Sequence, residues 1–401
     1  MYQSAASMFK NKKVLILGFG REGMSTYRFL RNMYPDMHLT IADKNEIKLD
    51  DKNVTLICGD SYMDSLNDFD IVMKSPGIAF LDVDIKDGTL VTCQTDLFLK
   101  FAPCRKVGIT GSKGKTTTST LIYDMLKEGG FDARLIGNIG VPVLEDINTV
   151  TPETIAVIEM SSHQLEFTTS SPEVAVLTNI YEEHLDHYRD GFRGYVNAKL
   201  NIVRRQKESD TFIYNATQGL DGLCDLDKIK SHKVGVKKDA PLPFAVNNEH
   251  LLGEHNRQDI LFAFEAAKHF GVDTAAAERA VEKFSGIEHR MEKVGTFRGI
   301  TFYNDCIATI PHAVECAVEA LKNVDTLIFG GMDRGLDYSE FENYLKKSNI
   351  KNLIGTPATG HKICDKIEGA PSKNVYKAAN LDEAVKKAYE VTAKGKICLL
   401  S

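Results

Sequence analysis

The sequence of 401 residues lacks an excess of positive charge and a long hydrophobic run. It holds 49 lysines and arginines against 55 aspartates and glutamates, which gives a net charge of −6. Because affinity for phosphate backbones needs positive charge, this balance excludes a general nucleic-acid or anionic-membrane binder. The net charge does not exclude local basic pockets that bind small phosphates. No uninterrupted apolar segment is long enough to cross a bilayer.

Paired cysteine motifs are also lacking. The eight cysteines are scattered and none forms a CxxC pair, which argues against a zinc ribbon and a thioredoxin-type site. Residues 1–13 contain no apolar segment of the kind that a secretion signal needs. These absences predict a soluble, cytoplasmic protein in a reducing compartment.

Short apolar runs alternate with helical stretches along the chain. Strands are predicted at 14–17, 38–42, 53–58, 70–74, 105–110, 154–159, 173–178, 300–303, 326–329, 352–355 and 397–400. Helices are predicted at 22–33, from 115 onward, and at 188–206, 251–270, 274–284, 311–321 and 338–347. Strands that alternate with helices indicate parallel sheets with helices on their faces, so the expected fold class is α/β.

The length predicts two or three domains, at about 150 residues per domain. A new strand pattern starts near Ala102-Pro103, and the charged, glycine-containing segment 284–294 marks a second boundary. We therefore expect three α/β domains, at 1–102, 103–289 and 290–401.

A glycine- and lysine-rich turn is the strongest local motif. Gly111, Ser112, Lys113, Gly114, Lys115, Thr116 and Thr117 follow a predicted strand and precede a predicted helix. Backbone N–H groups of such a turn point at an anion, and the helix N-terminus adds partial positive charge. Lys115 would reach the β- and γ-phosphates and Thr116 would bind Mg²⁺. The pattern GxxxxGK[ST] is incomplete because its first glycine falls on Ile109, but the context favours ATP binding over a glycine turn with solvated lysines.

Ionisable side chains follow the next predicted strands. Glu159 ends the apolar run 156–158, at the edge of a parallel sheet where ligands bind, and its carboxylate could hold Mg²⁺. The alternative is an edge carboxylate in water. His184 and His187 have the spacing of a zinc pair, but a third ligand at a recognisable spacing is missing, which disfavours zinc.

The N-terminal segment 18–23 has the pattern GxGxxG directly after a strand, with Asp43 twenty residues beyond Gly23. Taken alone it is a dinucleotide fingerprint, since it identifies a diphosphate at a helix N-terminus. A nicotinamide-dependent oxidoreductase is therefore an alternative interpretation at this point. It would leave the second glycine turn, Glu159 and Lys199 without a role.

Together these stretches resemble the Mur ligase family, which makes the peptide stem of bacterial cell-wall precursors. The matching stretches, in the family's order, are 110–117, 137–140, 159–162, 179–186, 197–199, 253–256, 289–290 and 304–305. The resemblance runs from about residue 12 to the end. The segment Ser161-Ser162-His163-Gln164-Leu165-Glu166 and the short N-terminal domain are most similar to members that add glutamate to UDP-N-acetylmuramoyl-L-alanine.

The resemblance implies a reaction and an architecture. A substrate carboxylate takes the γ-phosphoryl group of ATP, and the amino group of glutamate displaces phosphate from the acyl phosphate. A Rossmann-like domain would bind the UDP substrate, a central P-loop domain would bind ATP, and a Rossmann-like C-terminal domain would bind the amino acid. The expected protein is a monomer that binds neither nucleic acid nor membrane.

The resemblance also implies site residues. Lys115, His184 and Lys199 would be catalytic. Thr116 and Glu159 would hold one Mg²⁺, and His184 would help hold a second, together with a CO₂-derived carbamate on Lys199. From the residues alone, Lys199 would be a surface lysine of a helix. Residues implied in ATP binding, besides the glycine turn, are Asn256, Arg290 and Asp305.

The implied UDP-substrate site comprises Gly20, Arg21, Glu22, Asp43, Lys44, Ser75, Gly77 and Asn138. Thr309 and Arg334 would contact the amino acid, with Arg334 in place of a common lysine.

Some residues depart from the family's pattern. Ile307 replaces a usual lysine, and the family continues beyond Ser401, so we expect a truncated chain. Open alternatives are an L-glutamate or other amino-acid ligase and a non-catalytic nucleotide-binding relative. A folate polyglutamate ligase would not need residues 12–100.

Overall fold

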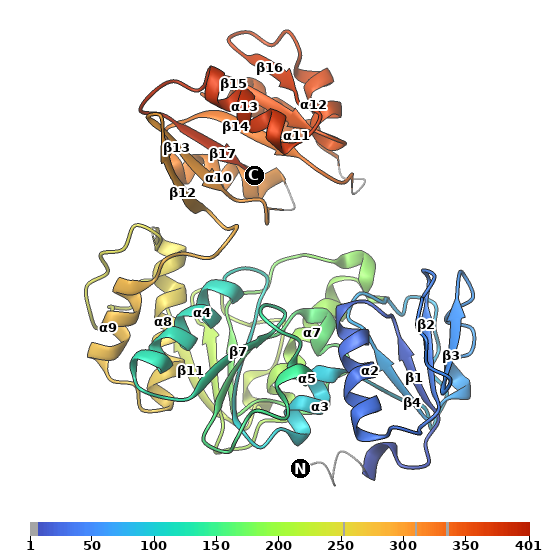
Figure 1. Ribbon diagram of the computed structural model, residues 1–401. Coiled ribbons are helices and arrows are strands. Elements are labelled where there is room, and N and C mark those ends of the chain that lie inside the picture. The colour runs from blue at the N-terminus through green and yellow to red at the C-terminus, as the bar shows by residue number, and fades with distance from the viewer. Residues whose placement is uncertain (1–6, 252, 309–310, 334–336) are drawn as a thin grey trace. The chain divides into compact units, whose positions relative to one another are not determined.

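The computed structural model describes residues 7–251, 253–308, 311–333 and 337–401 (Figure 1). The chain divides into two compact units, Met1–Asn248 with Glu254–Phe284, and Glu249–Gly253 with Ser285–Ser401. The first unit contains two sheets and the second contains one. The boundaries predicted at 102 and 289 stay predictions. Within the described ranges, no helix is both long and apolar enough to span a membrane.

The first sheet has the strand order β3-β2-β1-β4-β5, and all its pairs are parallel, as predicted. Its strands are β1 (Val14–Leu17), β2 (Leu39–Asp43), β3 (Val54–Cys58), β4 (Ile71–Lys74) and β5 (Leu90–Thr92). Helix α2 (Arg21–Met33) connects β1 to β2, and α3 (Gln94–Phe101) leads into the second sheet. The glycine turn 18–20 therefore lies at the carboxyl edge of a parallel sheet, where ligands bind in such folds.

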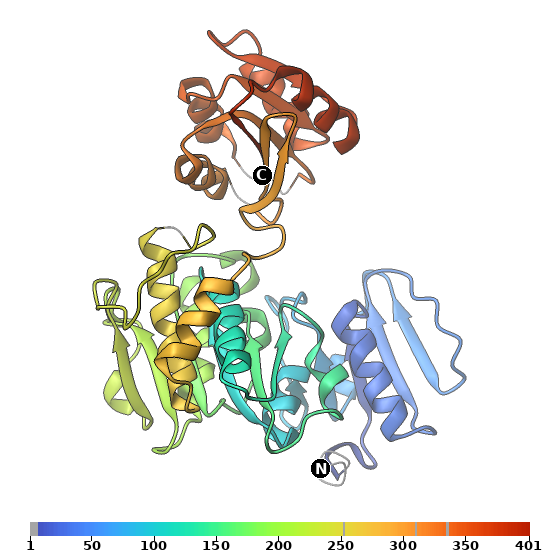
Figure 2. The ribbon, with the colours of Figure 1, turned by 60° about the vertical axis from the view of Figure 1, so that its left-hand side comes forward.

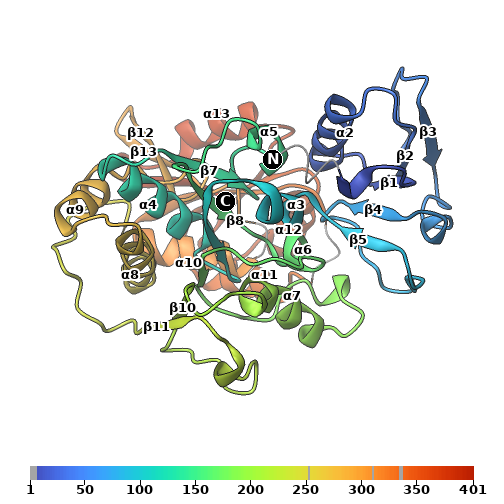
Figure 3. The same cartoon turned by 90° about the horizontal axis from the view of Figure 1, so that it is seen from below.

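The second sheet has the order β11-β10-β9-β6-β8-β7 and is also parallel. Its strands are β6 (Arg105–Thr110), β7 (Ala133–Gly137), β8 (Ile155–Glu159), β9 (Val174–Leu177), β10 (Thr211–Asn215) and β11 (His232–Val236). Its helices are α4 (Lys115–Glu128), α5 (Val143–Asp146), α6 (Ser162–Leu165), α7 (Phe192–Arg204), α8 (Glu254–His269) and α9 (Thr274–Lys283). Helix α4 packs beside α8 and α9 (Figures 1 and 3).

The core of this sheet explains why its strands are easy to recognise. Val107, Ile109, Ala156, Val157 and the apolar residues of β9 are at most 1% exposed. Strands covered on both faces are apolar at consecutive positions rather than alternating ones. The neighbouring strands β6, β8 and β9 end at the same edge, so the residues that follow them are brought together.

The third sheet belongs to the second unit and has the order β12-β13-β17-β14-β15-β16. Its strands are β12 (Glu292–Phe297), β13 (Ile300–Asn304), β14 (Val324–Gly330), β15 (Asn352–Thr356), β16 (Asn374–Lys377) and β17 (Ile397–Leu400). Only β12 is antiparallel to its neighbour, among the described strands. The last strand lies in the middle of the sheet, between β13 and β14.

Helices cover both faces of this third sheet (Figure 2). Apolar side chains of α10 (Pro311–Leu321), α11 (Ser339–Lys347) and α12 (Thr359–Ile367) form one core with Leu327 and Leu353. Helix α13 (Leu381–Val391) packs its alanines against Ile328 and Ile354 in a second core on the other face. The three-sheet α/β fold predicted from the sequence is confirmed.

Candidate functional site

The turn between β6 and α4 can be built only with glycine at two positions. Gly111 and Gly114 have φ angles of 153° and 81°. A Cβ atom at Gly111 would lie 1.9 Å from Thr178 Oγ1, and one at Gly114 would lie 2.4 Å from Asp259 Oδ1. The turn is also held by Asn179, whose carbonyl accepts from the Ser112 N–H at 3.0 Å. These contacts fix the strand–turn–helix geometry of a phosphate-binding loop.

The lysines of this turn differ in their surroundings. Lys115 is half-buried, and its Nζ donates to the carbonyls of Gly111 at 2.9 Å and Ser112 at 3.0 Å. Lys113 is exposed and forms an ion pair with Glu183 at 2.5 Å. The Lys115 side chain therefore folds back over the turn, where a bound phosphate would lie, whereas Lys113 faces the segment after β9.

Glu159 ends β8 beside the glycine turn and is 1% exposed. Its Oε1 accepts from Asn138 Nδ2 at 2.8 Å, and Ser119 Oγ lies 3.5 Å from its Oε2. The alternative of an edge carboxylate in water is therefore wrong. Thr116, at 8% exposed, lies in the first turn of the same helix that carries Ser119. Buried hydroxyl and carboxylate oxygens are the donors that Mg²⁺ prefers.

Lys199 is 2% exposed, so the surface-lysine interpretation is wrong. Its Nζ donates to the Gly111 carbonyl at 2.8 Å and lies 4.7 Å from the centre of the Tyr195 ring. Burial, together with the positive charge of Lys115, holds the pKa of Lys199 well below its ordinary value. Helix α7 thus places a lysine with a lowered pKa in direct contact with the glycine turn.

His184 follows β9 with a left-handed backbone, φ 53°. Its ring packs edge-on against His163 at 4.8 Å between centroids, and His163 lies 3.9 Å from His187. Burial and the two neighbouring histidines lower the pKa of His163 to about 3. Within the described ranges, no group of three or more histidine, cysteine, aspartate or glutamate side chains is arranged to hold a metal ion.

The N-terminal glycine turn is held in place by one carboxylate and one hydroxyl, from Asp43 and Ser75. Gly18 has φ 85°, and a Cβ atom at Gly23 would lie 1.9 Å from the Gly18 carbonyl oxygen. Asp43 Oδ2 accepts from the Phe19 N–H at 2.6 Å, and Ser75 Oγ donates to the Gly18 carbonyl at 2.8 Å. The structure therefore brings together the predicted residues of this turn, β2 and the loop after β4.

Two charged residues of this turn reach the second sheet. Glu22 accepts from Gln164 Nε2 at 2.7 Å, and Arg21 donates to the Gly140 carbonyl. Lys44, Gly20 and Gly77 lie exposed at the same edge of the first sheet. Arg21 thus reaches the loop that contains Asn138, which connects the two predicted halves of the substrate site.

The second unit contains its own predicted residues. Asp305 is 5% exposed, and it accepts from the Met291 N–H at 3.0 Å and from Ser401 Oγ at 3.1 Å. Burial raises the pKa of Asp305. The Nε of Arg290 is buried and has no hydrogen-bond partner among the described residues. Thr309 and Arg334 lie outside the described residues, and Asn256 lies in α8 of the first unit.

The sequence reasoning missed Tyr195, whose hydroxyl lies 2.6 Å from Ser112 Oγ. A signal for it was present. Tyr195, Val196, Ile202 and Val203 share one helical face with Lys199, since they lie three or four residues from it. That spacing places the lysine on the apolar, buried side of the helix.

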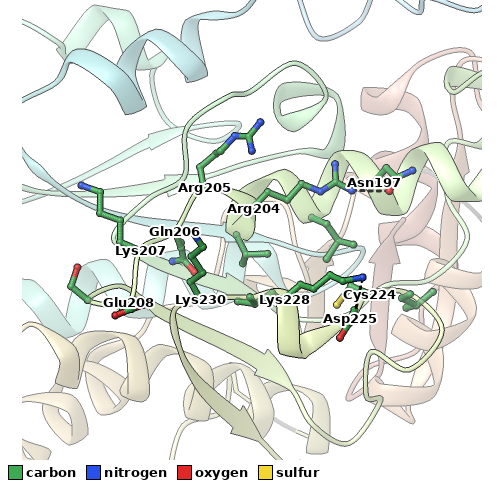
Figure 4. A pocket seen from close by; sticks show the side chains of 15 residues that line it. Asn197, Arg204, Arg205, Gln206, Lys207, Glu208, Cys224, Asp225, Lys228 and Lys230 are labelled. Carbon is green, nitrogen blue, oxygen red and sulfur yellow. Dashed lines mark hydrogen bonds and ion pairs between the residues drawn. The ribbon is translucent and has the colours of Figure 1, made fainter.

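A separate basic pocket of about 910 Å³ lies at the C-terminal end of α7 (Figure 4). It is lined by 204–209 and by parts of 223–230, which precede β10 and β11, and it contains no predicted site residue. Arg204 donates to Asn197 Oδ1 at 2.8 Å, and Lys228 pairs with Asp225 at 3.2 Å. These cations are thus engaged within the pocket wall.

Comparisons with known proteins agree along the chain. The family described as "Mur ligase MurD-like, N-terminal domain" matches residues 12–91. The "Mur ligase middle domain" matches residues 109–269, and the "Mur ligase, glutamate ligase domain" matches 289–401.

Two full-length relatives carry the name UDP-N-acetylmuramoylalanine--D-glutamate ligase. The protein of Clostridium kluyveri is 33% identical, and the match covers 98% of this chain and 92% of that one. The protein of Ligilactobacillus salivarius is 32% identical with the same coverage.

Solved structures show the same fold at lower identity. MurF ligase from Thermotoga maritima, solved in complex with ADP, has a TM-score of 0.59 at 17% identity, covering 96% of this chain and 90% of that one. UDP-N-acetylmuramate-alanine ligase MurC from the same organism has a TM-score of 0.59 at 18% identity, with coverages of 97% and 95%.

Proposed function

The chain belongs to the Mur ligase family, and we propose that it joins glutamate to UDP-N-acetylmuramoyl-L-alanine at the expense of ATP, in the synthesis of peptidoglycan precursors. The observation that carries this proposal is the buried group of Glu159, Lys199 and the glycine turn. The names of the full-length relatives supply the substrates, with D-glutamate as the amino acid. We further propose a cytoplasmic monomer with domains at 1–102, 103–289 and 290–401.

The reaction has two steps. The carboxylate oxygen of the muramoyl-alanine attacks the γ-phosphorus of ATP, and the bond to the β-phosphate oxygen breaks, which releases ADP. The glutamate amino group then adds to the acyl carbon, loses a proton, and expels phosphate to leave the amide. Lys115 lies over the turn that would cradle the phosphates, so its charge opposes the negative charge gathered during transfer.

We propose that two Mg²⁺ ions bind at this edge, with ligands that include a hydroxyl, a group derived from a neutral amine and a histidine besides the Glu159 carboxylate. The first would be held by Thr116 and by Glu159, a buried carboxylate hydrogen-bonded by a neutral amide. The second would be held by His184 and a modified Lys199. Bound Mg²⁺ neutralises charge on the phosphate oxygens.

Lys199 would be a carbamate in the active protein. Its neutral amine is favoured by burial, and only a neutral amine has the electron pair that adds to CO₂. The nitrogen bonds to the carbon of CO₂ and a proton leaves to solvent, so a cation is replaced by an anionic oxygen ligand. A protonated Lys199 would instead repel Mg²⁺ at this position.

The remaining substrates would bind at the other predicted positions. We propose that the first glycine turn binds UDP rather than NAD, through Gly20, Arg21, Glu22, Asp43, Lys44, Ser75 and Gly77, and that Asn138 contacts the muramoyl-peptide. Asn256, Arg290 and Asp305 would contact ATP. Thr309 and Arg334 would contact glutamate, since a guanidinium can bind a carboxylate through two parallel hydrogen bonds.

The experiment is release of phosphate from ATP, measured with each substrate omitted in turn. The proposal expects release only when UDP-N-acetylmuramoyl-L-alanine and D-glutamate are both present, and formation of the amide by mass spectrometry. Release that needs L-glutamate instead would identify the alternative ligase. ATP binding without turnover under every combination would favour the non-catalytic relative.

A further inference from the structure

The segment 184–189, which carries His184, is attached to the N-terminal sheet through a largely buried ion pair of Lys74 and Glu166. Lys74, the last residue of β4, donates to Glu166 Oε2 at 3.0 Å. The same carboxylate oxygen lies 3.3 Å from His187 Nε2. The Lys74 ammonium also lies 5.5 Å and 5.3 Å from the ring centres of Phe80 and Phe167. Glu166 therefore connects two segments that are far apart in the sequence.

The Lys74 ammonium and the Glu166 carboxylate stabilise each other's charged forms. Burial would raise the pKa of Glu166, but the hydrogen bond with His187 and the charge of Lys74 outweigh it and lower the pKa. The Lys74 side chain is only 2% exposed. Removing the carboxylate charge would leave a buried ammonium without compensation, which is costlier than loss of a surface ion pair.

A second attachment lies at the other end of the segment. Arg189 donates to the carbonyls of Leu81 at 2.7 Å and Val83 at 3.1 Å, and to Asp84 Oδ1 at 3.1 Å. Its side chain is half exposed, so this attachment is weaker than the buried one. Both attachments join the same segment to the first sheet or its loops.

These contacts have a consequence for His184. Lys74 directly precedes the turn Ser75–Gly77, and His187 stacks on His163, which in turn contacts the His184 ring. His184 also has a left-handed backbone, which a non-glycine residue adopts only when its surroundings hold it there. An unbroken series of contacts therefore runs from β4 to His184.

We propose that Glu166 is a positioning residue, which fixes the segment 184–189 against the N-terminal sheet and thereby sets the position of His184. Its kinetic consequences rest on the proposed function, because His184 is proposed there to hold Mg²⁺. The structural consequence, the order of the segment 184–189, does not depend on that function.

The test compares Glu166→Gln with a matched control, Glu173→Gln, in the full chain. Glu173 also lies between a cation and a histidine, with Arg105 Nε at 3.1 Å and His269 Nε2 at 3.0 Å. Amide hydrogen exchange of the segment 184–189 should become at least about tenfold faster in Glu166→Gln and stay unchanged in Glu173→Gln. Equal exchange in both variants would overturn the proposal.

The second experiment measures the steady-state kinetics of Glu166→Gln and of the unmodified protein. It gives kcat, KM for the UDP substrate and the Mg²⁺ concentration at half-maximal rate. Displacement of a group near the chemistry by about 1 Å can lower the rate on the order of 100-fold, so we expect kcat of Glu166→Gln to fall at least about tenfold. The Mg²⁺ requirement should rise, while KM for the UDP substrate should stay within about twofold because the glycine turn is intact. A normal Mg²⁺ requirement would contradict the proposal.

Arg189→Ala provides a second variant that removes only surface contacts. We expect a smaller acceleration of exchange in the same segment, and no acceleration would contradict the two-sided attachment. If the unmodified protein shows no glutamate-dependent phosphate release, the proposed function fails, while the exchange experiment still decides the role of Glu166.

Discussion

The two edges of the central sheet hold their buried and half-buried charges in different ways. At the amino edge, the Glu173 carboxylate lies between the Arg105 guanidinium and the His269 ring, so opposite charges meet. At the carboxyl edge, the Glu159 carboxylate accepts from the amide of Asn138, and Lys199 donates to a backbone carbonyl. Neutral groups are thus the partners of Glu159 and Lys199, while the exposed Lys113 pairs with Glu183 farther out at the same edge.

This difference separates a stabilising site from a preorganised one. A charge paired with an opposite charge has its field largely cancelled, and it contributes to the stability of the fold. A charge held by neutral groups keeps its field for a ligand, and its burial costs stability. The same sheet therefore has a stabilising ion pair at one edge and the proposed phosphate and metal sites at the other.

The largest expected effect comes from Lys199→Arg, which places a permanent positive charge at the carboxyl edge. Guanidinium cannot form the proposed carbamate, so ligase activity should fall by a factor of about 1,000 or more. The measurement is phosphate release, with the thermal midpoint as the control for folding. Normal turnover in a folded Lys199→Arg variant would contradict the proposed role.

The unmodified protein offers a test of the same lysine without substitution. Removal of CO₂ and bicarbonate should abolish activity, and added bicarbonate should restore it. With ¹³C-labelled bicarbonate, an NMR signal of a carbamate carbon should appear, and it should be absent from Lys199→Arg. Full activity after rigorous CO₂ removal would contradict the proposal.

Lys115→Ala should have the next largest effect. The lysine donates to the carbonyls of Gly111 and Ser112 and is half-buried rather than part of the apolar core, so its loss should change the thermal midpoint far less than the rate. Loss of a charge contact to the transferred phosphoryl group should cost about 3 kcal/mol, or on the order of 100-fold in rate. Lys113→Ala is the matched control. A similar loss of rate in Lys113→Ala would show that the rate depends on the total charge of the turn and not on the position of Lys115.

The sequence predicted the carboxyl edge better than its surroundings. Strand β8 is buried along its whole length, so its continuous apolar run was unambiguous, and β6 is marked by the residue pattern of the glycine turn that follows it. Strands β11 and β12 were not predicted because they are largely exposed edge strands with little apolar character. Helix α6 spans four residues, too few to show a helical period.

Individual side-chain environments were harder to predict than the motifs. Lys199 was expected from composition to be exposed, because lysine is seldom buried, and only the resemblance gave it a role. The Lys74–Glu166 pair joins residues 92 positions apart, and no local pattern indicates such a contact. Long-range polar contacts follow from the packing of whole elements.

Glu173→Gln tests the amino edge and should affect stability rather than activity. Burial would raise the pKa of Glu173, but hydrogen bonds from His269 and Arg105 lower it from 4.5 to about 2. A shift of this size corresponds to at most about 3 kcal/mol, and partial exposure of the side chain reduces it to about 2 kcal/mol at neutral pH.

The pH dependence gives the sign of this effect. A lowered carboxyl pKa stabilises the fold above the unfolded value of 4.5, and the contribution is lost as the pH falls toward about 2. The difference in unfolding free energy between the unmodified protein and Glu173→Gln should therefore shrink over that range. The measurement is denaturant titration at several pH values. If the difference in unfolding free energy stays constant with pH, the Glu173 ion pair is not the source of the stabilisation.

The smallest expected effect extends the comparison to the carboxyl edge of the first sheet. There the glycine turn itself contains no lysine and lies beside Asp43 and Glu22, with Lys44 exposed at the same edge, and Asp43 already accepts from the Phe19 N–H. Such a turn should bind a diphosphate only with help from Arg21.

We expect UDP to bind more tightly than NAD⁺ in calorimetric titrations, and Arg21→Ala to weaken UDP binding about tenfold, or about 1.4 kcal/mol. Arg28→Ala, on the same helix, is the control that should leave binding unchanged. Tighter binding of NAD⁺ would instead favour a dinucleotide site, and the acidic turn would then have the role that its glycine pattern alone suggests.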